Sequence, residues 1–595
     1  MSSLKVAKGG KGSSPKKKPP KKTPEEKREA LRRRNHSKAI KSVFEGAGFS
    51  LIPTLTNAEF VFKEKKCDLD RVYVLDNVVV IVEETYTSAN HLSDHLEGKK
   101  TIFDYINSDR AAFIAYLRAK FPDFSSAVSS VYHNHHVQLR IVYAPLNRLK
   151  DAAKIHVKDV QFLDYHILRY FFQLSRAIRL SCVYELLEFL SVSPAQFKSN
   201  VAMPKIPSTA FPGSVLPSLQ SHFPEGFKVV SFYTSAARLM ERSFVLRKNS
   251  WRDSTGAYQR ALSIKKIGAI RRFLLAKSGV FVNNIIATLP TSTRFESDDG
   301  TQVDPSKLLD VQPISVNLPN AFNSVGLIDG QHRVFSYYEG GPDEAEIALL
   351  RDQQNLLVTG IVFPPGLDEI SRDRFAAQLF LQINSRQTKP PPELTQEIDV
   401  LLRPNAVTSM ARRILSVMGQ RGPLEGEFVS PLSETGRIRT ASVVNYALVP
   451  LVRPSSAESL FSQWTHTNKQ LLANAKANDT SIEDLLNAYV EYCVVEINRF
   501  IGAFRFNLPK DRWSPSKKDE PGLLSVTFVN GLLHALRRLA GAGKLADADF
   551  YREKLATISD FDFQGYTSSS YSEMGYEIAE EYFGISKSEL PASTE

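Results

Sequence analysis

The run Asp329-Gly330-Gln331-His332-Arg333 groups side chains that are suited to binding a phosphate. It follows the apolar segment Val325–Ile328 and precedes a helical pattern, so the sequence predicts a strand, a sharp turn and a helix start. Gly330 lets the backbone approach a ligand closely, and the helix directs free N–H groups at the turn. Arg333 offers a planar fork for phosphate oxygens, and His332 titrates near neutral pH.

The same run has a purely structural interpretation. Asp329 would cap the helix, and Arg333 would form an ion pair on the surface. In the phosphate-binding interpretation, Asn384 or Gln387, at the end of a predicted helix 372–383, lies on the opposite wall of the site. The sequence leaves both interpretations open.

The pentapeptide resembles the signature of the DGQHR-domain family, which includes the regulator associated with DNA phosphorothioate modification. The family is similar to the ParB/sulfiredoxin fold, in which a Gly-x-x-Arg turn binds nucleotide phosphates. This resemblance spans about residues 227–402 and assigns that role here to Gly330 and Arg333. It implies a protein of a DNA-modification or phage-defence system that binds DNA or nucleotide phosphate through Asp329–Arg333.

A second resemblance lies upstream, in Asp68-Leu69-Asp70 and Ile81-Val82-Glu83-Glu84-Thr85. These segments look like the restriction-endonuclease fold, in which a hairpin presents an Asp and then Glu-x-Lys. The resemblance implies that Asp70 and Glu83 hold a divalent metal, usually Mg²⁺. Thr85 stands where that pattern has its catalytic lysine, so Lys99 or Lys100 of the next helix would have to substitute. His95 is another polar candidate nearby.

The predicted elements of this region fit such a module. The pattern indicates a helix over 39–47, two strands over 69–75 and 78–84 joined by the turn 76–77, a polar helix over 90–107 and a strand over 137–143. This order of helix, two strands, helix and strand is typical of an α/β unit.

The net charge of +11 belongs almost entirely to the N-terminus. Residues 1–35 carry 9 Lys and 4 Arg against 3 Glu, a net charge of +10, which leaves +1 for the other 560 residues. Such a segment is predicted to be a disordered arm, with a helix over 25–34 as one option, and it either binds nucleic-acid phosphates without sequence preference or acts as a solubilising tail.

Composition places the rest of the chain among globular proteins. Three widely separated cysteines and the absence of a long apolar run favour a reducing, cytoplasmic location without membrane contact. The predicted fold is α/β (α+β) and multi-domain. Its expected parts are a disordered basic arm over 1–36, a restriction-endonuclease-like α/β module over 37–148, a helical segment and linker over 149–225, a ParB/sulfiredoxin-like domain over 226–402, and a mostly helical region over 403–595.

The sequence is consistent with three functions. The first is a DNA-associated modification or defence protein with a nuclease-like module, for which Asp70, Glu83, Thr85 and Lys99 are the catalytic candidates and Mg²⁺ the cofactor if the module is active. The second is a non-catalytic DNA-binding transcriptional regulator, and the third a nucleotide-hydrolysing switch. Expected partners are DNA, with a nucleotide and other modification or restriction proteins as further options.

Overall fold

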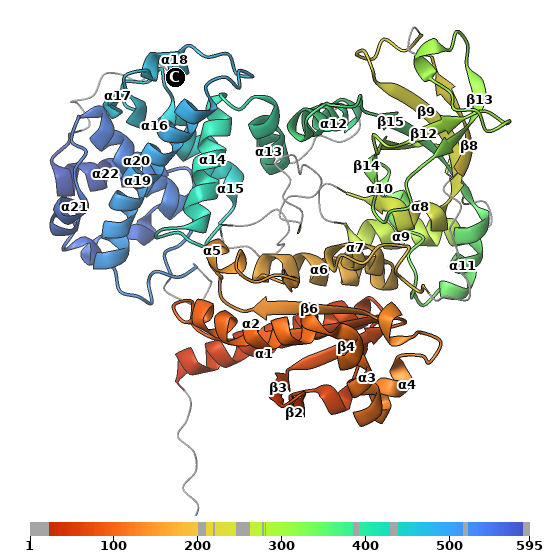
Figure 1. Cartoon of the computed structure of the whole chain (residues 1–595). Helices are drawn as coiled ribbons and strands as arrows, with labels where there is room; N and C mark the ends of the chain where they lie inside the picture. Colours follow the sequence, from red (N-terminus) through yellow and green to blue (C-terminus); the bar gives the residue numbers. More distant parts are fainter. Residues whose placement is uncertain are drawn as a thin grey trace, which may run out of the picture. The chain divides into compact units, whose positions relative to one another are not determined.

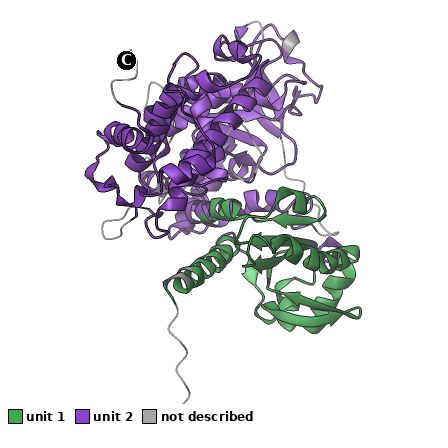
Figure 2. Cartoon of the chain, turned by 90° about the vertical axis from the view of Figure 1, so that its left-hand side faces the viewer, with its two compact units in different colours: residues 1–45, 49–130, 139–172 green, residues 46–48, 131–138, 173–595 purple. Residues whose placement is uncertain are grey.

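The computed structural model describes residues 23–199, 210–217, 220–245, 251, 262–276, 279, 281–384, 392–428, 438–515 and 522–586. The chain divides into two compact units (Figure 2). Unit 1 comprises residues 1–45, 49–130 and 139–172, and unit 2 comprises residues 46–48, 131–138 and 173–595.

Unit 1 is built around a five-stranded sheet with the strand order β1-β4-β5-β6-β7. β1 pairs antiparallel with β4, β4 pairs antiparallel with β5, and β6 pairs parallel with β7. A separate hairpin of β2 and β3 precedes β4. The strands are β1 (Ser50–Leu51), β2 (Ala58–Phe62), β3 (Lys65–Leu69), β4 (Arg71–Leu75), β5 (Val78–Thr85), β6 (Gln138–Pro145) and β7 (Val160–Phe162).

Helices cover both faces of this sheet. On one face Phe44 of the long helix α1 stacks on Tyr73 of β4 with 4.7 Å between ring centroids. Neighbouring strand residues point to opposite faces, and all residues of β5 except Glu84 are buried, so the other face is covered as well. The helices are α1 (Pro24–Gly46), η1 (Pro53–Leu55), α2 (Leu92–Ser108), α3 (Arg110–Lys120), α4 (Pro122–Ala127), η2 (Asn134–His136) and α5 (Asp151–Lys154) (Figure 1).

The predicted elements of this module are present, with one correction at the N-terminus. The predicted hairpin corresponds to β4 and β5, the polar helix to α2 and the later strand to β6. The helical option over 25–34 is present as part of a longer helix, because α1 runs without interruption from Pro24 to Gly46 and crosses the expected boundary at residue 36. Buried side chains such as His36 and Ile40 hold this helix to unit 1 from its middle onward.

Unit 2 contains an eight-stranded mixed sheet with the order β10-β14-β11-β15-β9-β8-β13-β12. β14 pairs antiparallel with β11, which pairs parallel with β15. The strands are β8 (Ala210–Leu216), β9 (Lys228–Ser235), β10 (Ser243–Phe244), β11 (Ile285–Leu289), β12 (Arg294–Glu296), β13 (Gln312–Asn317), β14 (Val325–Asp329) and β15 (Asn355–Val362). The helices that accompany it are α6 (Tyr165–Ile178), which begins in unit 1, η3 (Arg179–Cys182), α7 (Val183–Phe189), α8 (Ala236–Arg242), α9 (Ile264–Leu275), η5 (Pro305–Lys307), α10 (Gln331–Phe335), α11 (Glu344–Gln353) and α12 (Glu369–Asn384).

Part of this sheet was not expected from the sequence. β8 lies inside the Pro-rich stretch that was predicted to be a linker, and β12 and β13 lie in a stretch with no predicted element. β8 pairs on both sides, with β9 and with β13, and Gly213 permits this because a Cβ there would lie 2.5 Å from the carbonyl oxygen of Ser231. Pairing with neighbours, which local sequence does not reveal, therefore overrides the loop-like composition.

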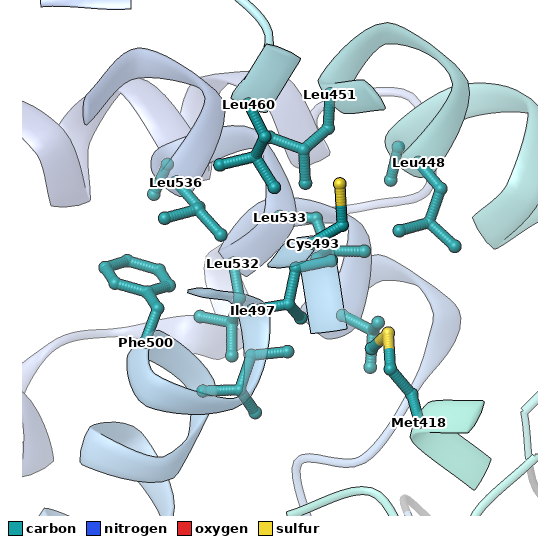
Figure 3. Close-up of a cluster of buried hydrophobic side chains, with 14 of the residues drawn as sticks. Met418, Leu448, Leu451, Leu460, Cys493, Ile497, Phe500, Leu532, Leu533 and Leu536 are labelled. Carbon is teal, nitrogen blue, oxygen red and sulfur yellow. The ribbon is translucent and has the colours of Figure 1, made fainter. Parts of the chain in front are cut away.

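The C-terminal part of unit 2 is mostly helical, in agreement with the sequence. Leucine, phenylalanine and sulfur-containing side chains from several of its helices converge on one apolar core (Figure 3). Its elements are α13 (Pro392–Leu402), α14 (Val407–Gln420), α15 (Thr440–Ser442), the π-helix η6 (Val443–Leu448), α16 (Val449–Val452), α17 (Leu460–Gln463), α18 (Lys469–Ala473), α19 (Glu483–Asn507), α20 (Val526–Gly541), α21 (Ala548–Lys554), η7 (Ile558–Asp560), η8 (Phe563–Gly565) and α22 (Tyr571–Phe583).

The protein is therefore of mixed α/β class with several parts, as the composition and periodicity predicted. In the portion of the chain that the structure describes, no helix combines the length and the apolar character needed to cross a membrane.

Candidate functional site

Asp70 and Glu83 lie side by side at one edge of the sheet in unit 1. Asp70 is the residue between β3 and β4, and Glu83 is the third residue from the end of β5. In the antiparallel register Arg71 stands opposite Val82, so the next pair along places Asp70 opposite Glu83. Directly opposed residues of an antiparallel pair point to the same face of the sheet, so the two carboxyl groups are neighbours.

Burial raises the pKa of both acids, and the charge of Asp70 adds to the shift at Glu83. Glu83 is only 3% exposed, and burial together with the charge of Asp70 raises its pKa to about 8. Burial also raises the pKa of Asp70, although the backbone N–H of Glu84, which donates to Asp70 Oδ2 over 2.7 Å, opposes that shift. An acid pair of this kind favours a cation between or beside its members.

Lys99 supplies a positive charge to this pair. Its Nζ lies 2.8 Å from Glu83 Oε1 and 2.7 Å from Asp68 Oδ2. Burial alone would lower the pKa of Lys99, but the charge of Glu83 and the hydrogen bonds to Asp68 and Glu83 raise it above its ordinary value. We refer to Asp68, Asp70, Glu83 and Lys99 as the carboxylate site.

The position of Lys99 on α2 explains why it reaches the sheet and Lys100 does not. Leu92, Leu96 and Phe103 form the buried stripe of α2, and Lys99 falls on that stripe at helical spacing. Lys100 is turned away and makes an ion pair with Glu97 of its own helix at 3.6 Å. Of the two lysines that the sequence offered, the structure therefore places Lys99 at the carboxylates.

Thr85 occupies the strand position at which the resemblance expects a lysine. It lies two residues beyond Glu83 on β5, and therefore on the same face, and it is 3% exposed. Its hydroxyl donates to Thr87 Oγ1 over 2.9 Å and hydrogen-bonds Tyr143. Tyr143 OH in turn lies 2.9 Å from His95 Nδ1, so Thr85, Tyr143 and His95 form a polar chain next to Glu83.

The opposite face of the same sheet edge has its own network, which the sequence did not predict. Arg71 Nε lies 2.7 Å from Glu84 Oε1, and Arg71 Nη2 donates to Ser37 Oγ of α1 over 2.5 Å. Tyr86 OH donates to Glu84 Oε2 over 2.8 Å. The network fixes α1 to the strand end that carries Asp70 and Glu83. Asp68 is likewise a residue to which the sequence gave no role.

The donor set of the carboxylate site fits a Mg²⁺ ion. Mg²⁺ keeps several waters and is commonly bound through one or two carboxylates, and Asp70 and Glu83 supply two that repel one another. No group of three or more His, Cys, Asp or Glu residues arranged for a metal occurs within the described ranges. The fit is thus to a hydrated Mg²⁺ on two carboxylates, with no support for a closed cage of protein ligands.

The pentapeptide forms the predicted turn between a strand and a helix. Asp329 ends β14, Gly330 has a φ of +93° in the left-handed region, and α10 begins at Gln331. A Cβ on Gly330 would lie 2.5 Å from Ile285 Cδ1. The helix has five residues, and a single turn carries too small a dipole to form an anion site by itself.

The polar groups of the pentapeptide mainly bind other parts of unit 2. Arg333 Nη2 lies 2.8 Å from Asp329 Oδ2, and Arg333 Nη1 donates to the carbonyl oxygen of Asn283 over 2.7 Å. His332 Nε2 accepts from the backbone N–H of Ser263 over 3.1 Å. Asp329 therefore pairs with Arg333, as the structural interpretation expected, but Gly330 and not Asp329 stands at the helix start.

The structure gives less information on three further residues that the sequence predicted for this site. Gln331 has a buried Oε1 without a hydrogen-bond partner among the described residues. Asn384 is the last residue of α12, but its side chain is outside what the structure describes, and Gln387 lies outside the described residues altogether. Nothing in the described part of unit 2 places either of them opposite Arg333.

Comparison of this chain with protein-family models, with curated proteins and with solved structures found no match.

Proposed function

We propose that unit 1 is a metal-dependent nuclease module that hydrolyses phosphodiester bonds in DNA. The observation that carries this proposal is the convergence of Asp70, Glu83 and Lys99 at one sheet edge, with Lys99 Nζ 2.8 Å from Glu83 Oε1. Two carboxylates and one lysine are the groups that the restriction-endonuclease resemblance requires. In this chain the lysine comes from α2 and not from β5.

Each residue of the site has a distinct task in this reaction. Asp70 and Glu83 hold the cation, and Lys99 orients the attacking water and offsets negative charge on the scissile phosphate. Asp68, which shares Lys99 with Glu83, positions the ammonium group. A divalent cation at Asp70 and Glu83 would supply further positive charge to stabilise the pentacoordinate phosphorus of the transition state. Hydrolysis forms one P–O bond to water and breaks one P–O bond of the backbone.

The experiment is a cleavage assay with the full chain. Purified protein is incubated with single-stranded, duplex and modified DNA in Mg²⁺, Mn²⁺ or EDTA. We expect cleavage that needs the metal and falls by at least about 100-fold in Asp70→Asn and Glu83→Gln. The matched control is Glu59→Gln on the β2–β3 hairpin, an exposed carboxylate that pairs with Lys66. Metal-independent cleavage, or equal activity in all three variants, would overturn the proposal.

A non-catalytic DNA-binding regulator is the second candidate. The observation in its favour is that Lys99 already has two carboxylate partners, while the buried Thr85 replaces the lysine of the strand motif. DNA binding without cleavage in any of the metal conditions would select this candidate.

We propose, on the pentapeptide alone, that the whole protein is a DGQHR-domain protein of a DNA-modification or phage-defence system, with a ParB/sulfiredoxin-like domain around the eight-stranded sheet. Phosphate binding by Arg333 would require the phosphate to replace Asp329. Both side chains of that pair keep some exposed surface, at 16% and 31%, so a phosphate can approach them from solvent. A phosphate that engages the guanidinium with two hydrogen bonds can compensate for the loss.

A further inference from the structure

The first half of α1 exposes a group of cations. Lys27, Arg32, Arg33, Arg34 and Lys38 are all exposed, and we call them the α1 basic segment. Arg32 and Arg33 share one acid, Glu29, at 3.9 Å and 3.2 Å. Arg34 and Lys38 have no ion-pair partner among the described residues, so the segment retains a clear positive excess.

Several contacts fix this segment to the sheet edge that carries the carboxylate site. His36, which is 2% exposed, places Nε2 3.1 Å from the carbonyl oxygen of Ala144 near the end of β6. Arg32 Nη2 donates to the carbonyl oxygen of Leu146 over 3.5 Å, and the guanidinium of Arg33 lies 5.7 Å from the ring of Tyr86. Ala144 belongs to β6, and Leu146 and Tyr86 follow β6 and β5, so α1 is held at the strand ends that carry Glu83 on the opposite face of the sheet.

The orientation of α1 carries the basic segment past that edge. From Ser37 onward the helix packs on the sheet, as the stacking of Phe44 on Tyr73 records. The N-terminal end of α1 extends away from the rest of unit 1 (Figure 2). Because the anchors lie next to Arg33 and Arg34, these cations are held at a fixed position relative to Asp70 and Glu83.

The electrostatics of the carboxylate site create a need for such cations. Asp68, Asp70 and Glu83 stand against a single lysine, and Lys99 is already paired. Once Asp70 and Glu83 lose their protons, a polyanion approaching that edge meets carboxylates that repel it. Attraction from a neighbouring group of guanidinium and ammonium groups is what would keep its backbone there.

We propose that the α1 basic segment binds the sugar-phosphate backbone of the nucleic acid that is cleaved at the carboxylate site. The part of this inference that concerns cleavage rests on the proposed function. Binding by α1 can be tested separately. The chemistry recognised is a row of backbone phosphates, which single strands and duplexes both offer.

The test measures binding of single-stranded and duplex oligonucleotides in EDTA as a function of salt. The α1 variant is a triple substitution, Arg33→Gln, Arg34→Gln and Lys38→Gln. It keeps the hydrogen bonds that Arg32, His36 and Ser37 make with the rest of unit 1. The matched control, Lys63→Gln, Lys65→Gln, Lys120→Gln, removes the same charge from exposed residues elsewhere in unit 1. For duplex DNA, we expect the negative slope of log K against log salt to become shallower by about 2–3 in the α1 variant. In the control it should change by less than about 0.5. Circular dichroism verifies that α1 remains helical.

The outcomes separate this inference from the proposed nuclease. If the slope falls and no metal-dependent cleavage is found, the basic segment binds nucleic acid and the nuclease proposal alone fails. If the chain cleaves DNA but the two triple variants bind alike, or if neither single strand nor duplex binds the native chain, the inference is overturned. Binding to anionic phosphatidylserine vesicles that falls in the α1 variant, with oligonucleotide binding unchanged, would also overturn it and assign the segment to a lipid surface.

Discussion

Lys99 Nζ lies 2.8 Å from Glu83 Oε1, although Lys99 belongs to α2 and Glu83 to β5. The helix thus delivers an ammonium group to the face of the sheet on which the strand itself offers Thr85. This relationship turns an incomplete strand motif into a set of two carboxylates and a lysine. Under the proposed function, Lys99 takes the part of the strand lysine that Thr85 replaces.

Glu83 should make the stability of the metal-free protein depend on pH. Its pKa is about 8 in the folded chain, against an ordinary value of 4.5, so between these values the folded state holds a proton that the unfolded state lacks. The contribution of Glu83 to the free energy of unfolding is fully present below about pH 4.5 and is lost as pH rises to about 8. Glu83→Gln should flatten this slope in thermal unfolding scans run in EDTA. An equally steep slope in the variant would contradict the assigned proton.

Mg²⁺ should stabilise the protein more at pH 8 than at pH 6. A carboxylate must lose its proton to hold the metal, and Glu83 keeps its proton over most of that range. The increase in Tm on adding Mg²⁺ should therefore grow with pH and level off above about pH 8. Glu59→Gln is the control and should behave like the native chain. A Mg²⁺ effect that is constant with pH, or that persists in Asp70→Asn, would contradict binding at this pair.

Asp68→Asn should have a small effect compared with Glu83→Gln. The side chain of Asp68 is 49% exposed and that of Glu83 is 4% exposed, although both pair with Lys99. A half-exposed ion pair is worth at most about 1 kcal/mol, which corresponds to about fivefold in kcat/KM. Asp68→Glu should recover most of the loss if Asp68 only positions Lys99. A loss above about 100-fold in Asp68→Asn would instead make Asp68 a ligand of the metal.

The hairpin that carries this site was predictable, because β4 and β5 are apolar, β-branched strands around a two-residue turn. The choice between Lys99 and Lys100 was also within reach of the sequence, since Lys99 continues the stripe of Leu92, Leu96 and Phe103. That stripe identifies the lysine that faces the sheet. The role of Asp68 was not predictable, because it depends on how the β2–β3 hairpin meets α2.

Other errors came from long-range pairing. β8 looks like a linker because it contains Pro212 and Gly213, yet it lies between two paired neighbours. The arm was predicted to be disordered up to residue 36, with a helix over 25–34 as one option, whereas α1 runs from Pro24 to Gly46 as one helix. Helix contacts with the sheet edge, such as that of His36 with Ala144, cannot be inferred from local composition.

Gly330→Ala should destabilise unit 2 more than Gly366→Ala does. Both glycines have a positive φ, +93° and +88°, but a Cβ would meet Ile285 at Gly330 and nothing within 4 Å at Gly366. The backbone strain alone costs about 1 kcal/mol or somewhat more, and crowding at Gly330 adds to it, so we expect about 1–3 kcal/mol there. Urea unfolding measures both. Equal decreases in the free energy of unfolding would mean that the side chain of Ile285 moves aside without an energetic penalty.

Asp329→Asn should strengthen phosphate binding by the pentapeptide if Asp329 competes with the ligand for Arg333. The substitution removes the carboxylate that lies 2.8 Å from Arg333 Nη2. Titration with inorganic phosphate and with a nucleotide should then show a lower Kd than in the native chain, and Arg333→Ala should abolish the gain. If Arg333→Ala changes only the stability of unit 2, and phosphate binding per folded molecule stays the same, the pentapeptide is a structural turn.

The substitution of a strand lysine by a helix lysine is the central claim, and a lysine exchange tests it most directly. Metal-dependent cleavage is measured for Lys99→Ala, for the control Lys100→Ala, and for Lys99→Ala combined with Thr85→Lys. Thr85 lies on the same face as Glu83, so a lysine there can extend toward the space that Lys99 leaves. We predict a loss of at least about 100-fold in Lys99→Ala, little change in Lys100→Ala, and partial recovery in the double variant. Native activity in Lys99→Ala, or an equal loss in Lys100→Ala, would contradict the account.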